Sequence, residues 1–473
     1  MQDSFGGLLE PSDRLGEKCG VIAAASASGE AARIVYYGLW ALQHRGQESS
    51  GITASDSRSL YHHSGIGLVS QAYREDDLAK LPGTLAIGHN RYSTSGEKDL
   101  TQPILRSKAG FALAHNGNLP SVAALQAFLV DRGINIRGHN DSELMADSIE
   151  YYLSEGHDLA SAVRASYPLF TGAFSCVAVA PGQIVAFRDP MGIRPLALGK
   201  LSDGFVVASE SCAFDTIGAG FLREVAPGEM IMINKDGYDS DQLVEGQQRL
   251  DIFELVYFAR PDSLILGKRV NEVRRRMGIN LAREVKVKAD VIIPVPDSAI
   301  PAALGIAAET GIPFDHGLIK NRYIHRTFIR PAQSQRERDL QMKLNPLPEA
   351  IMGRSVAVVD DSIVRGTTTK KLVQMLYGAG AREVHVLISS PPVRYPDFYG
   401  IDTPKQSELI AANHTIEEVC QIIGADSLNF LSYDGMINAT GLPVTKFSTA
   451  CFNGEYPIDI LERTKEVRRP VAV

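Results

Sequence analysis

The segment from Ser355 to Leu376 most constrains what this chain of 473 residues can fold into. It reads SVAVVDDSIVRGTTTKKLVQML: an apolar run that ends in two aspartates, a short polar loop with one glycine, and a helical pattern. Strands that are apolar throughout are buried on both faces, which is typical of a parallel sheet covered by helices. The segment therefore predicts a strand, loop and helix of a doubly wound α/β domain.

The loop between this strand and helix has the chemistry of an anion-binding site. A helix start presents free backbone N–H groups and the positive end of the helix dipole, and Gly366 lets the backbone approach a ligand closely. Two adjacent carboxylates would repel a bare phosphate, so Asp360 and Asp361 are expected beside sugar hydroxyls or a magnesium ion. Because neither GxxxxGKS/T nor GxGxxG occurs, a sugar-phosphate site is favoured over a nucleotide P-loop. Hydroxyl donors come from Ser362, Thr367 and Thr368.

A second apolar run is expected at the same edge of the sheet. DVIIPVP, residues 290–296, predicts a strand that presents Asp297 and Ser298 at its carboxyl end, where ligands bind in open α/β sheets. Residues 320–347 follow, dense in Lys and Arg, and are either a solvated basic loop or a mobile flap that closes over pyrophosphate and excludes water. The cations that the flap would supply are Lys320, Arg322 and Arg326.

The first half of the chain has a different sequence pattern, with many short strand-like runs separated by glycine and asparagine. Two helical patterns, at 31–45 and 141–156, interrupt these strands. We expect a sheet-rich layered domain in the first half. A second domain is expected to begin near Asp251, where this sequence pattern changes. The predicted boundaries are 19–252 for the first domain and 253–473, with a C-terminal extension, for the second.

Charge and cysteine content exclude several classes of protein. The 48 basic and 55 acidic residues give a net charge of −7, which argues against a nucleic-acid partner. No stretch approaches about eighteen uninterrupted apolar residues, and the first residues lack the basic and apolar regions of a secretory signal. We therefore expect no membrane contact and a cytoplasmic location. Five scattered cysteines without a CxxC are expected to be free thiols.

The motifs of both halves resemble known enzyme families. VVDDSIVRGTT resembles the diphosphate-sugar motif of type I phosphoribosyltransferases. The glutaminase domain of class II glutamine amidotransferases is similar, in order, to LQHRGQESSGI, GHNRYSTSG, AHNGNL, HNDSELMA, GAFSCVAV and FRDPMGIRPL. Together with VPDS and KNRY, these motifs resemble the amidophosphoribosyltransferase family over nearly the whole chain. The resemblance implies an enzyme that converts glutamine, phosphoribosylpyrophosphate (PRPP) and water to phosphoribosylamine, glutamate and pyrophosphate, the first committed step of purine biosynthesis.

The resemblance also implies a fold and roles for the second half. The implied fold class is α/β in two domains: an αββα glutaminase domain of the Ntn-hydrolase type, then a doubly wound parallel-sheet phosphoribosyltransferase domain. Asp360 and Asp361 are implied to hold the ribose hydroxyls or the metal, and the loop from Ser362 to Thr368, which includes Arg365, to hold the ribose phosphate. Magnesium is the implied cofactor, and its implied ligands are Ser298, Asp360 and Asp361.

In the first half, the resemblance implies that Cys19 is the nucleophile and that its own α-amino group is the base. Such an amine titrates near pH 8 and exchanges a proton with the thiol, which a peptide nitrogen cannot do. We therefore expect residues 1–18 to be a propeptide that is removed. The other implied glutamine-site residues are Asn116 and Gly117 for the oxyanion, Arg91 for the carboxylate and Asp141 for the ammonium group of glutamine.

A branch of this family carries a four-cysteine iron-sulfur cluster, and this chain departs from that branch. Asp251, Asp397 and Ser448 stand where three of the cluster cysteines would be, and only Cys451 remains. Because a cluster needs about four thiolates, we expect none. The family also implies purine nucleotides as feedback inhibitors and a homodimer or homotetramer as the assembly.

Two alternative functions are weighed against this reaction. A different class II amidotransferase, such as the hexosamine-forming one, is disfavoured because the second half carries a PRPP motif instead of a sugar isomerase pattern. A catalytically silent regulator that senses PRPP or nucleotides would keep the ligand pocket and lose the glutaminase residues. The presence of Cys19, Arg91 and Asn116 speaks against the silent regulator.

Overall fold

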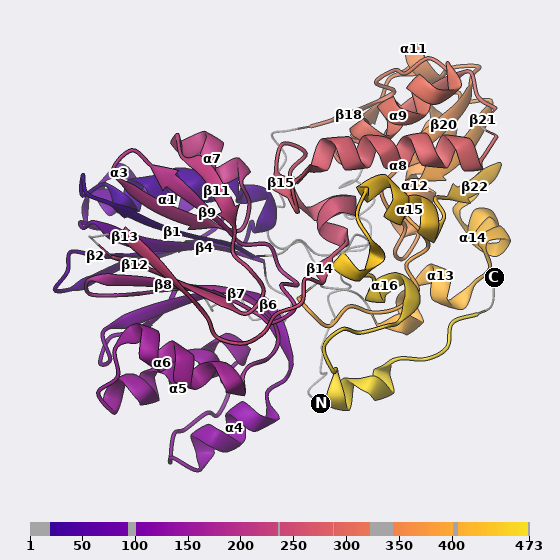
Figure 1. The fold of residues 1–473 in the computed structure, drawn as a ribbon. Helices are drawn as coiled ribbons and strands as arrows, with labels where there is room; N and C mark the ends of the chain where they lie inside the picture. Colours follow the sequence, from indigo (N-terminus) through magenta and orange to yellow (C-terminus); the bar gives the residue numbers. More distant parts are fainter. Residues whose placement is uncertain are drawn as a thin grey trace, which may run out of the picture.

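The structure, a computed structural model, describes residues 19–92, 101–234, 237–286, 288–321, 344–400 and 405–471. Figure 1 shows two bodies side by side: stacked sheets with outer helices in the first half, and a smaller sheet surrounded by helices in the second. The predicted α/β class with two differently built halves is confirmed. No helix in these ranges is long and apolar enough to cross a membrane.

Two antiparallel sheets lie face to face in the first half. Their strand orders are β11-β9-β10-β1-β4-β2-β3 and β13-β12-β8-β7-β6-β5. The first sheet consists of β1 (Gly20–Ser26), β2 (Ser49–Ser55), β3 (Leu60–Ile66), β4 (Leu85–Arg91), β9 (Ala197–Leu201), β10 (Gly204–Ala208) and β11 (Gly220–Glu224). The second consists of β5 (Ile104–Arg106), β6 (Phe111–Ser121), β7 (Thr171–Ala180), β8 (Gln183–Arg188), β12 (Glu229–Asn234) and β13 (Gly237–Gln242).

Successive side chains along a strand point to opposite faces of the sheet, and apolar side chains on both faces explain why both are covered. In β1, Val21 and Ala23 belong to the core between the sheets, whereas Ile22 and Ala24 pack under the outer helices. The outer layer of the first sheet contains α1 (Ala31–Ala41), α2 (Val69–Ala72), α3 (Glu75–Ala79) and α7 (Cys212–Ile217). The outer layer of the second contains α4 (Ala123–Val130), α5 (Asp141–Ser154) and α6 (Leu159–Ser166). The layers are therefore α, β, β and α, as the resemblance implied.

The second half is built on a parallel sheet in the order β17-β20-β21-β22. Its strands are β17 (Val291–Pro294), β20 (Ser355–Asp360), β21 (Glu383–Ile388) and β22 (Ser427–Phe430). One face packs on α8 (Val270–Glu284), α9 (Ile300–Thr310) and α15 (Tyr433–Thr440), and the other on α12 (Thr367–Gly378) and α14 (Ile416–Ile423). The strands are buried from both sides, which accounts for their apolar runs.

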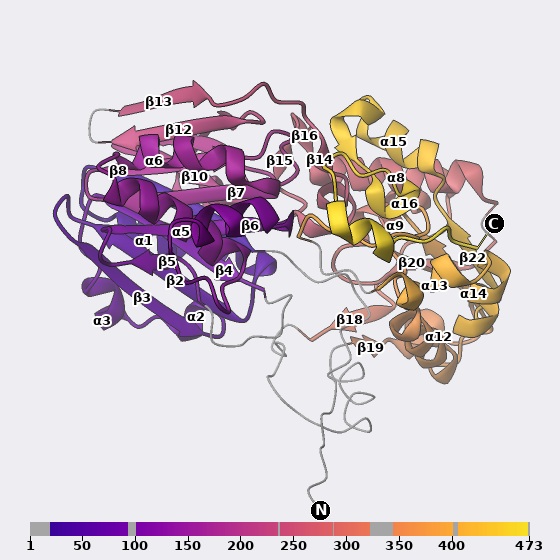
Figure 2. The ribbon, with the colours of Figure 1, turned by 90° about the horizontal axis from the view of Figure 1, so that it is seen from below.

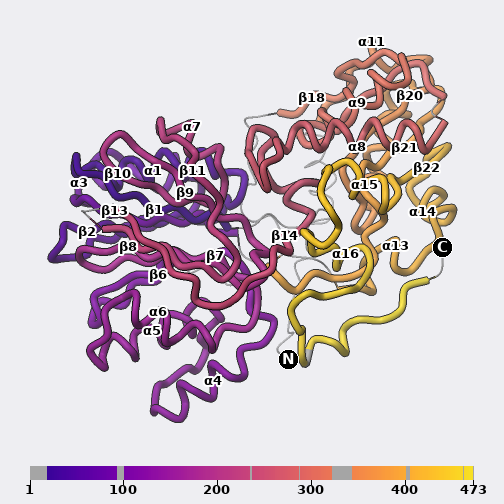
Figure 3. The backbone as a smooth tube through the Cα atoms, viewed as in Figure 1, coloured from indigo at the N-terminus to yellow at the C-terminus, as the bar shows by residue number. Residues whose placement is uncertain are grey.

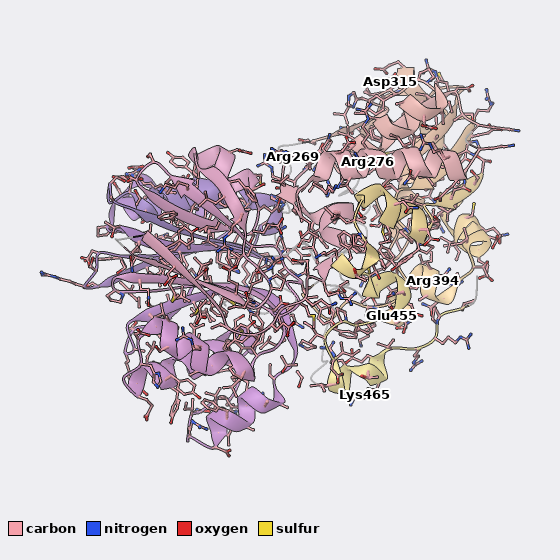
Figure 4. All side chains as sticks on the ribbon, viewed as in Figure 1. Arg269, Arg276, Asp315, Arg394, Glu455 and Lys465 are labelled. Atoms are coloured by element: carbon pink, nitrogen blue, oxygen red, sulfur yellow. The ribbon has the colours of Figure 1, made fainter. Side chains whose placement is uncertain are left out.

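Shorter elements complete the second half. They are β15 (Leu264–Ile265), β16 (Lys268–Arg269), β18 (Leu318–Lys320), β19 (Leu344–Pro346), α11 (Pro348–Ile351), α13 (Ile410–Asn413) and α16 (Ala450–Asn453). In Figure 4, the labelled Arg269 lies beside the first half, and side chains from both halves fill the junction.

The chain crosses between the halves at β14 (Leu250–Asp251), as the tube in Figure 3 shows. This strand pairs in parallel with β23 (Phe447–Ser448) near the end of the chain and leads into a π-helical turn, Glu254–Phe258. In Figure 2, β6, β7 and β14 lie on the side of the first half that faces the second. The boundaries 1–18, 19–252 and 253–473 stay predictions.

Candidate active sites

Four of the five residues predicted for the glutamine site line one cavity of about 620 Å³ in the first half: Cys19, Arg91, Gly117 and Asp141. Cys19 immediately precedes β1, and Arg91 ends the neighbouring strand β4. Gly117 lies within β6 of the second sheet, and Asp141 begins α5. The fifth residue, Asn116, is buried beside Gly117.

Strand β6 has a shape at Gly117 that only glycine accommodates. The φ angle is 155°, and a Cβ atom there would lie 1.9 Å from the carbonyl oxygen of Ala173. Beside it, the Nδ2 atom of Asn116 is buried and has no hydrogen-bond partner within the described ranges. A buried donor without a partner costs free energy unless a ligand brings the acceptor. An oxyanion is such an acceptor, so this pair is suited to stabilise a tetrahedral intermediate.

The Cys19 thiol is partly buried, in surroundings that favour its neutral form. Its Sγ atom lies 3.9 Å from the carbonyl oxygen of Tyr92. Burial raises the pKa of the thiol, although this contact and the positive charge of Arg91 act in the opposite direction. A thiol with a raised pKa needs a base before it can act as a nucleophile.

Sequence reasoning missed two residues that hold Asp141 in place. The backbone N–H and hydroxyl of Ser142 donate to Asp141 Oδ1, at 2.7 and 3.2 Å, and His115 Nδ1 lies 2.9 Å from Ser142 Oγ. Burial lowers the pKa of His115, so its ring is neutral near neutral pH. Both residues stand in motifs that the sequence displays, but their spacing does not show that the two side chains meet.

The second site forms where β17 and β20 end. The two strands pair in parallel, so their carboxyl ends meet at one edge of the sheet. Ser298 Oγ donates to Asp361 Oδ2 at 2.5 Å, and Ser362 Oγ donates to Asp361 Oδ1 at 2.8 Å. Asp360 accepts from the backbone N–H of Asp361 at 3.0 Å, and both carboxylates are buried. Four predicted PRPP or metal residues therefore come together.

A cavity of about 300 Å³ lies beside these carboxylates. Asp297, Ser298 and Lys320 line it, and Lys320 Nζ lies 3.0 Å from Asp297 Oδ2. The cavity also has walls that sequence reasoning did not predict, including Arg274 from α8 and His44 from the first half. The cavity is thus shared by the two halves of the chain.

Arg274 is a buried cation with no acidic partner in hydrogen-bond contact within the described ranges. Its Nε and Nη2 atoms donate to the carbonyl oxygens of Leu255 and Ala259, at 2.9 and 2.8 Å, and so hold the π-helical turn. Burial lowers its pKa to about 10. No motif marked this arginine, because its role depends on a turn 15 to 19 residues earlier in the chain.

The remaining predicted residues lie around the start of α12. Gly366 has a φ of 81°, a left-handed conformation that favours glycine, and Thr367 and Thr368 begin the helix. Arg365 is paired elsewhere, because its Nε and Nη2 atoms donate to Glu408 Oε2 at 3.0 and 2.7 Å. Arg322 and Arg326, predicted in the flap, lie outside the described residues.

Comparison with known proteins decides the family. A family model described as a glutamine amidotransferase domain matches residues 89–216. The chain is 48% identical to the amidophosphoribosyltransferase of Synechococcus elongatus over 466 residues, which cover 97% of this chain and 94% of that protein. The chain belongs to the amidophosphoribosyltransferase family.

Comparison with other members of the amidophosphoribosyltransferase family supports the same assignment. The Bacillus subtilis protein is 44% identical, with 95% of this chain and 96% of that protein covered. The solved structure of the glutamine PRPP amidotransferase from B. subtilis, complexed with ADP and GMP, superposes with a TM-score of 0.87 over 94% of this chain and 98% of that one. The predicted reaction, glutamine-dependent amidophosphoribosyl transfer in purine biosynthesis, is thereby confirmed, and the silent regulator is not favoured.

Two of the positions at which the resemblance places cluster cysteines in a branch of the family, Asp251 and Asp397, lie beside a buried arginine. Arg194 Nη2 is 3.1 Å from Asp251 Oδ2 and 3.9 Å from Asp397 Oδ1, and Ser448 is opposite Asp251 in the pairing of β14 with β23. Within the described ranges, no group of three or more His, Cys, Asp or Glu side chains is arranged to hold a metal ion.

Proposed function

We propose that Cys19 hydrolyses glutamine in the first cavity and that the ammonia reacts with PRPP at the ends of β17 and β20. The observation that carries this assignment is that Cys19, Arg91, Gly117 and Asp141 line one cavity, beside the unpartnered amide of Asn116. The three kinds of group that glutamine needs, a nucleophile, charges of both signs and an oxyanion donor, are thus present together.

In the glutaminase step, Arg91 would bind the carboxylate of glutamine and Asp141 its ammonium group. The Cys19 thiolate then attacks the amide carbon, and the Asn116 side chain and Gly117 backbone stabilise the oxyanion. Ammonia leaves, and water hydrolyses the thioester to glutamate.

The base in this step is the α-amino group of Cys19, which exists only after the bond between Lys18 and Cys19 is cleaved. The raised pKa of the thiol supports the need for such a base. We therefore propose that residues 1–18 are removed. Full glutamine-dependent activity in protein whose intact mass still includes these residues would contradict removal.

At the second site, the buried carboxylates of Asp360 and Asp361 would hold the ribose hydroxyls, and the backbone N–H groups at the start of α12 the ribose phosphate. The oxygen donors Asp360, Asp361 and Ser298 suit magnesium, which prefers carboxylate and hydroxyl oxygen together with substrate phosphates. When bound, the ion would offset the charge of the departing pyrophosphate. Lys320 would add a positive charge beside it.

Because ammonium lacks the lone pair that attacks carbon, ammonia must reach PRPP without meeting water. The cavity shared by His44 of the first half and Asp297 of the second supports delivery between the halves. We further propose purine nucleotides as inhibitors at the PRPP site, since their ribose and phosphate match it, a homo-oligomeric assembly, and a location in the cytoplasm.

The test is to supply purified enzyme with glutamine, PRPP and magnesium and to measure glutamate and pyrophosphate together. We expect one glutamate for each pyrophosphate. Cys19→Ala should lose synthesis from glutamine and keep synthesis from ammonia, because only the first cavity is damaged. Glutamate without pyrophosphate in the wild-type enzyme would show that the second site has been misassigned.

A further inference from the structure

The cavity of about 300 Å³ that is shared by the two halves contains one titratable side chain from the glutaminase half that no step above uses. His44 belongs to a short 3₁₀ turn, Gln43–Arg45, and lines this cavity together with Asp297, Ser298 and Lys320. The same turn packs beside the start of β1, the strand that follows Cys19, because a Cβ atom at Gly20 would lie 3.4 Å from Arg45 Cβ. His44 therefore lies on a turn that touches both the nucleophile's strand and the PRPP cavity.

A buried carboxylate holds one nitrogen of the His44 ring. Glu210 Oε1 lies 2.7 Å from His44 Nε2, and Glu210 is fully buried. Glu210 is surrounded by donors, because Oε2 also accepts from the Arg260 backbone N–H at 2.9 Å and from Ser263 Oγ at 2.5 Å. Burial acts to raise the pKa of Glu210, but the charge of Arg45 holds it well below its ordinary value. An ionised carboxylate only accepts hydrogen bonds, so His44 Nε2 carries the hydrogen.

In the neutral ring with its hydrogen on Nε2, the other ring nitrogen is an acceptor with a free lone pair. His44 Nδ1 is buried and has no hydrogen-bond partner within the described ranges. A buried acceptor without a donor is costly, and ammonia, with three N–H groups, is a donor of the right size. Histidines that act as general bases are arranged in this way: a carboxylate binds one nitrogen of the imidazole, and the other nitrogen is free to accept a proton.

We propose that His44 is a catalytic residue of the acceptor site, which binds ammonia through Nδ1 and takes up the proton released by its attack. The lone pair of ammonia forms the bond to C1 of PRPP, and the bond from C1 to the pyrophosphate oxygen breaks, with its electron pair leaving on pyrophosphate. One proton of the new ammonium group then moves to Nδ1 and onward to water, so that neutral phosphoribosylamine is left. Glu210 stabilises the imidazolium in between.

Two substitutions separate this role from a structural one, and both rest on the proposed two-site reaction. His44→Gln keeps an N–H where Nε2 donates to Glu210 and removes the Nδ1 acceptor. His44→Asn leaves an oxygen near Nδ1 that accepts a hydrogen bond but takes up no proton. Either variant that folds, as judged by circular dichroism, decides the question. His414→Gln is the control, because His414 pairs with Glu418 at the surface, 3.6 Å apart.

Pyrophosphate release from ammonia and PRPP should fall about 100-fold in the His44 variants and stay unchanged in the control. Glutamate release from glutamine with PRPP should continue within about twofold, so that glutamate exceeds pyrophosphate. Pyrophosphate release near the wild-type rate, or a parallel fall of both products, would overturn the role of His44. If the wild-type enzyme released glutamate without pyrophosphate, the proposed function itself would have failed.

Discussion

At the residue scale, Gly117 is the position at which one added methyl group should separate the two half-reactions. Its φ of 155° and the contact of 1.9 Å that a Cβ would make with the Ala173 carbonyl leave no room for alanine. Gly117→Ala should therefore distort the proposed oxyanion hole and lower kcat for glutamine hydrolysis about 100-fold or more. Synthesis from ammonia should remain, because the second site is untouched.

The control for this substitution is Gly182→Ala, in the turn between β7 and β8. Gly182 also has a positive φ, 85°, but a Cβ there would meet nothing within 4 Å. Gly182→Ala should lower the free energy of unfolding by about 1 kcal/mol and leave glutamine hydrolysis unchanged. Equal losses in both variants would mean that backbone strain, and not the oxyanion hole, is responsible.

His89 gives a prediction for pH. It is fully buried, and burial lowers its pKa to about 3, from an ordinary value of 6.5. Because the folded state resists protonation, the stability that neutral His89 confers is present above pH 6.5 and is lost as the pH falls toward 3. Between pH 7 and 5 this one group should lower the free energy of unfolding by about 2 kcal/mol.

Thermal unfolding of the wild type and of His89→Gln at both pH values tests this linkage. Glutamine retains an N–H for the bond that His89 Nε2 makes to the His115 carbonyl oxygen, 3.1 Å away, but it does not titrate. The variant should lose about 2 kcal/mol less than the wild type between pH 7 and 5. Identical losses in the two proteins would show that His89 makes no such contribution.

At the element scale, the start of α12 should control PRPP binding without affecting glutamine. Gly366 is left-handed, with a φ of 81°, and a Cβ there would lie 2.7 Å from Ile410 Cδ1. Gly366→Ala should shift the N–H groups at the helix start and raise KM for PRPP about tenfold with either nitrogen donor. Gly353→Ala, with a φ of 72° and open space at its Cβ, should leave KM unchanged. An unaltered KM in Gly366→Ala would remove the loop from the PRPP site.

The same element shows how much the sequence predicts. In the segment from Ser355 onward, the strand is buried at every position and the helix only on one face, and the sequence displays both patterns, so local chemistry was enough to predict them. The helix expected over residues 31–45 ends instead at Ala41, because Arg45 must reach Glu210 and Glu254 in a 3₁₀ turn. The contacts of Arg274 and His115 were equally hidden, because each joins elements whose neighbourhood only the fold determines.

At the scale of the whole molecule, buried ion pairs join the two halves of the chain. Arg194 is fully buried and meets Asp251 at 3.1 Å and Glu254 at 3.2 Å, and it donates to the carbonyl oxygen of Tyr399 at 2.9 and 3.0 Å. Arg45 reaches the same Glu254 at 2.5 Å. Removing Arg194 takes one cation away from the buried carboxylates of Asp251 and Glu254, which costs far more than losing an exposed pair.

Arg194→Met should accordingly lower the free energy of unfolding by about 3 to 5 kcal/mol. The surface pair of Arg283 and Glu309 is the control, because Arg283→Met should cost about 1 kcal/mol or less. Looser contact between the halves should also release ammonia to solvent, so that glutamate exceeds pyrophosphate in Arg194→Met while Arg283→Met keeps them equal. A destabilised Arg194→Met enzyme that still forms one glutamate per pyrophosphate would show that these ion pairs stabilise the fold but do not seal the path between the sites.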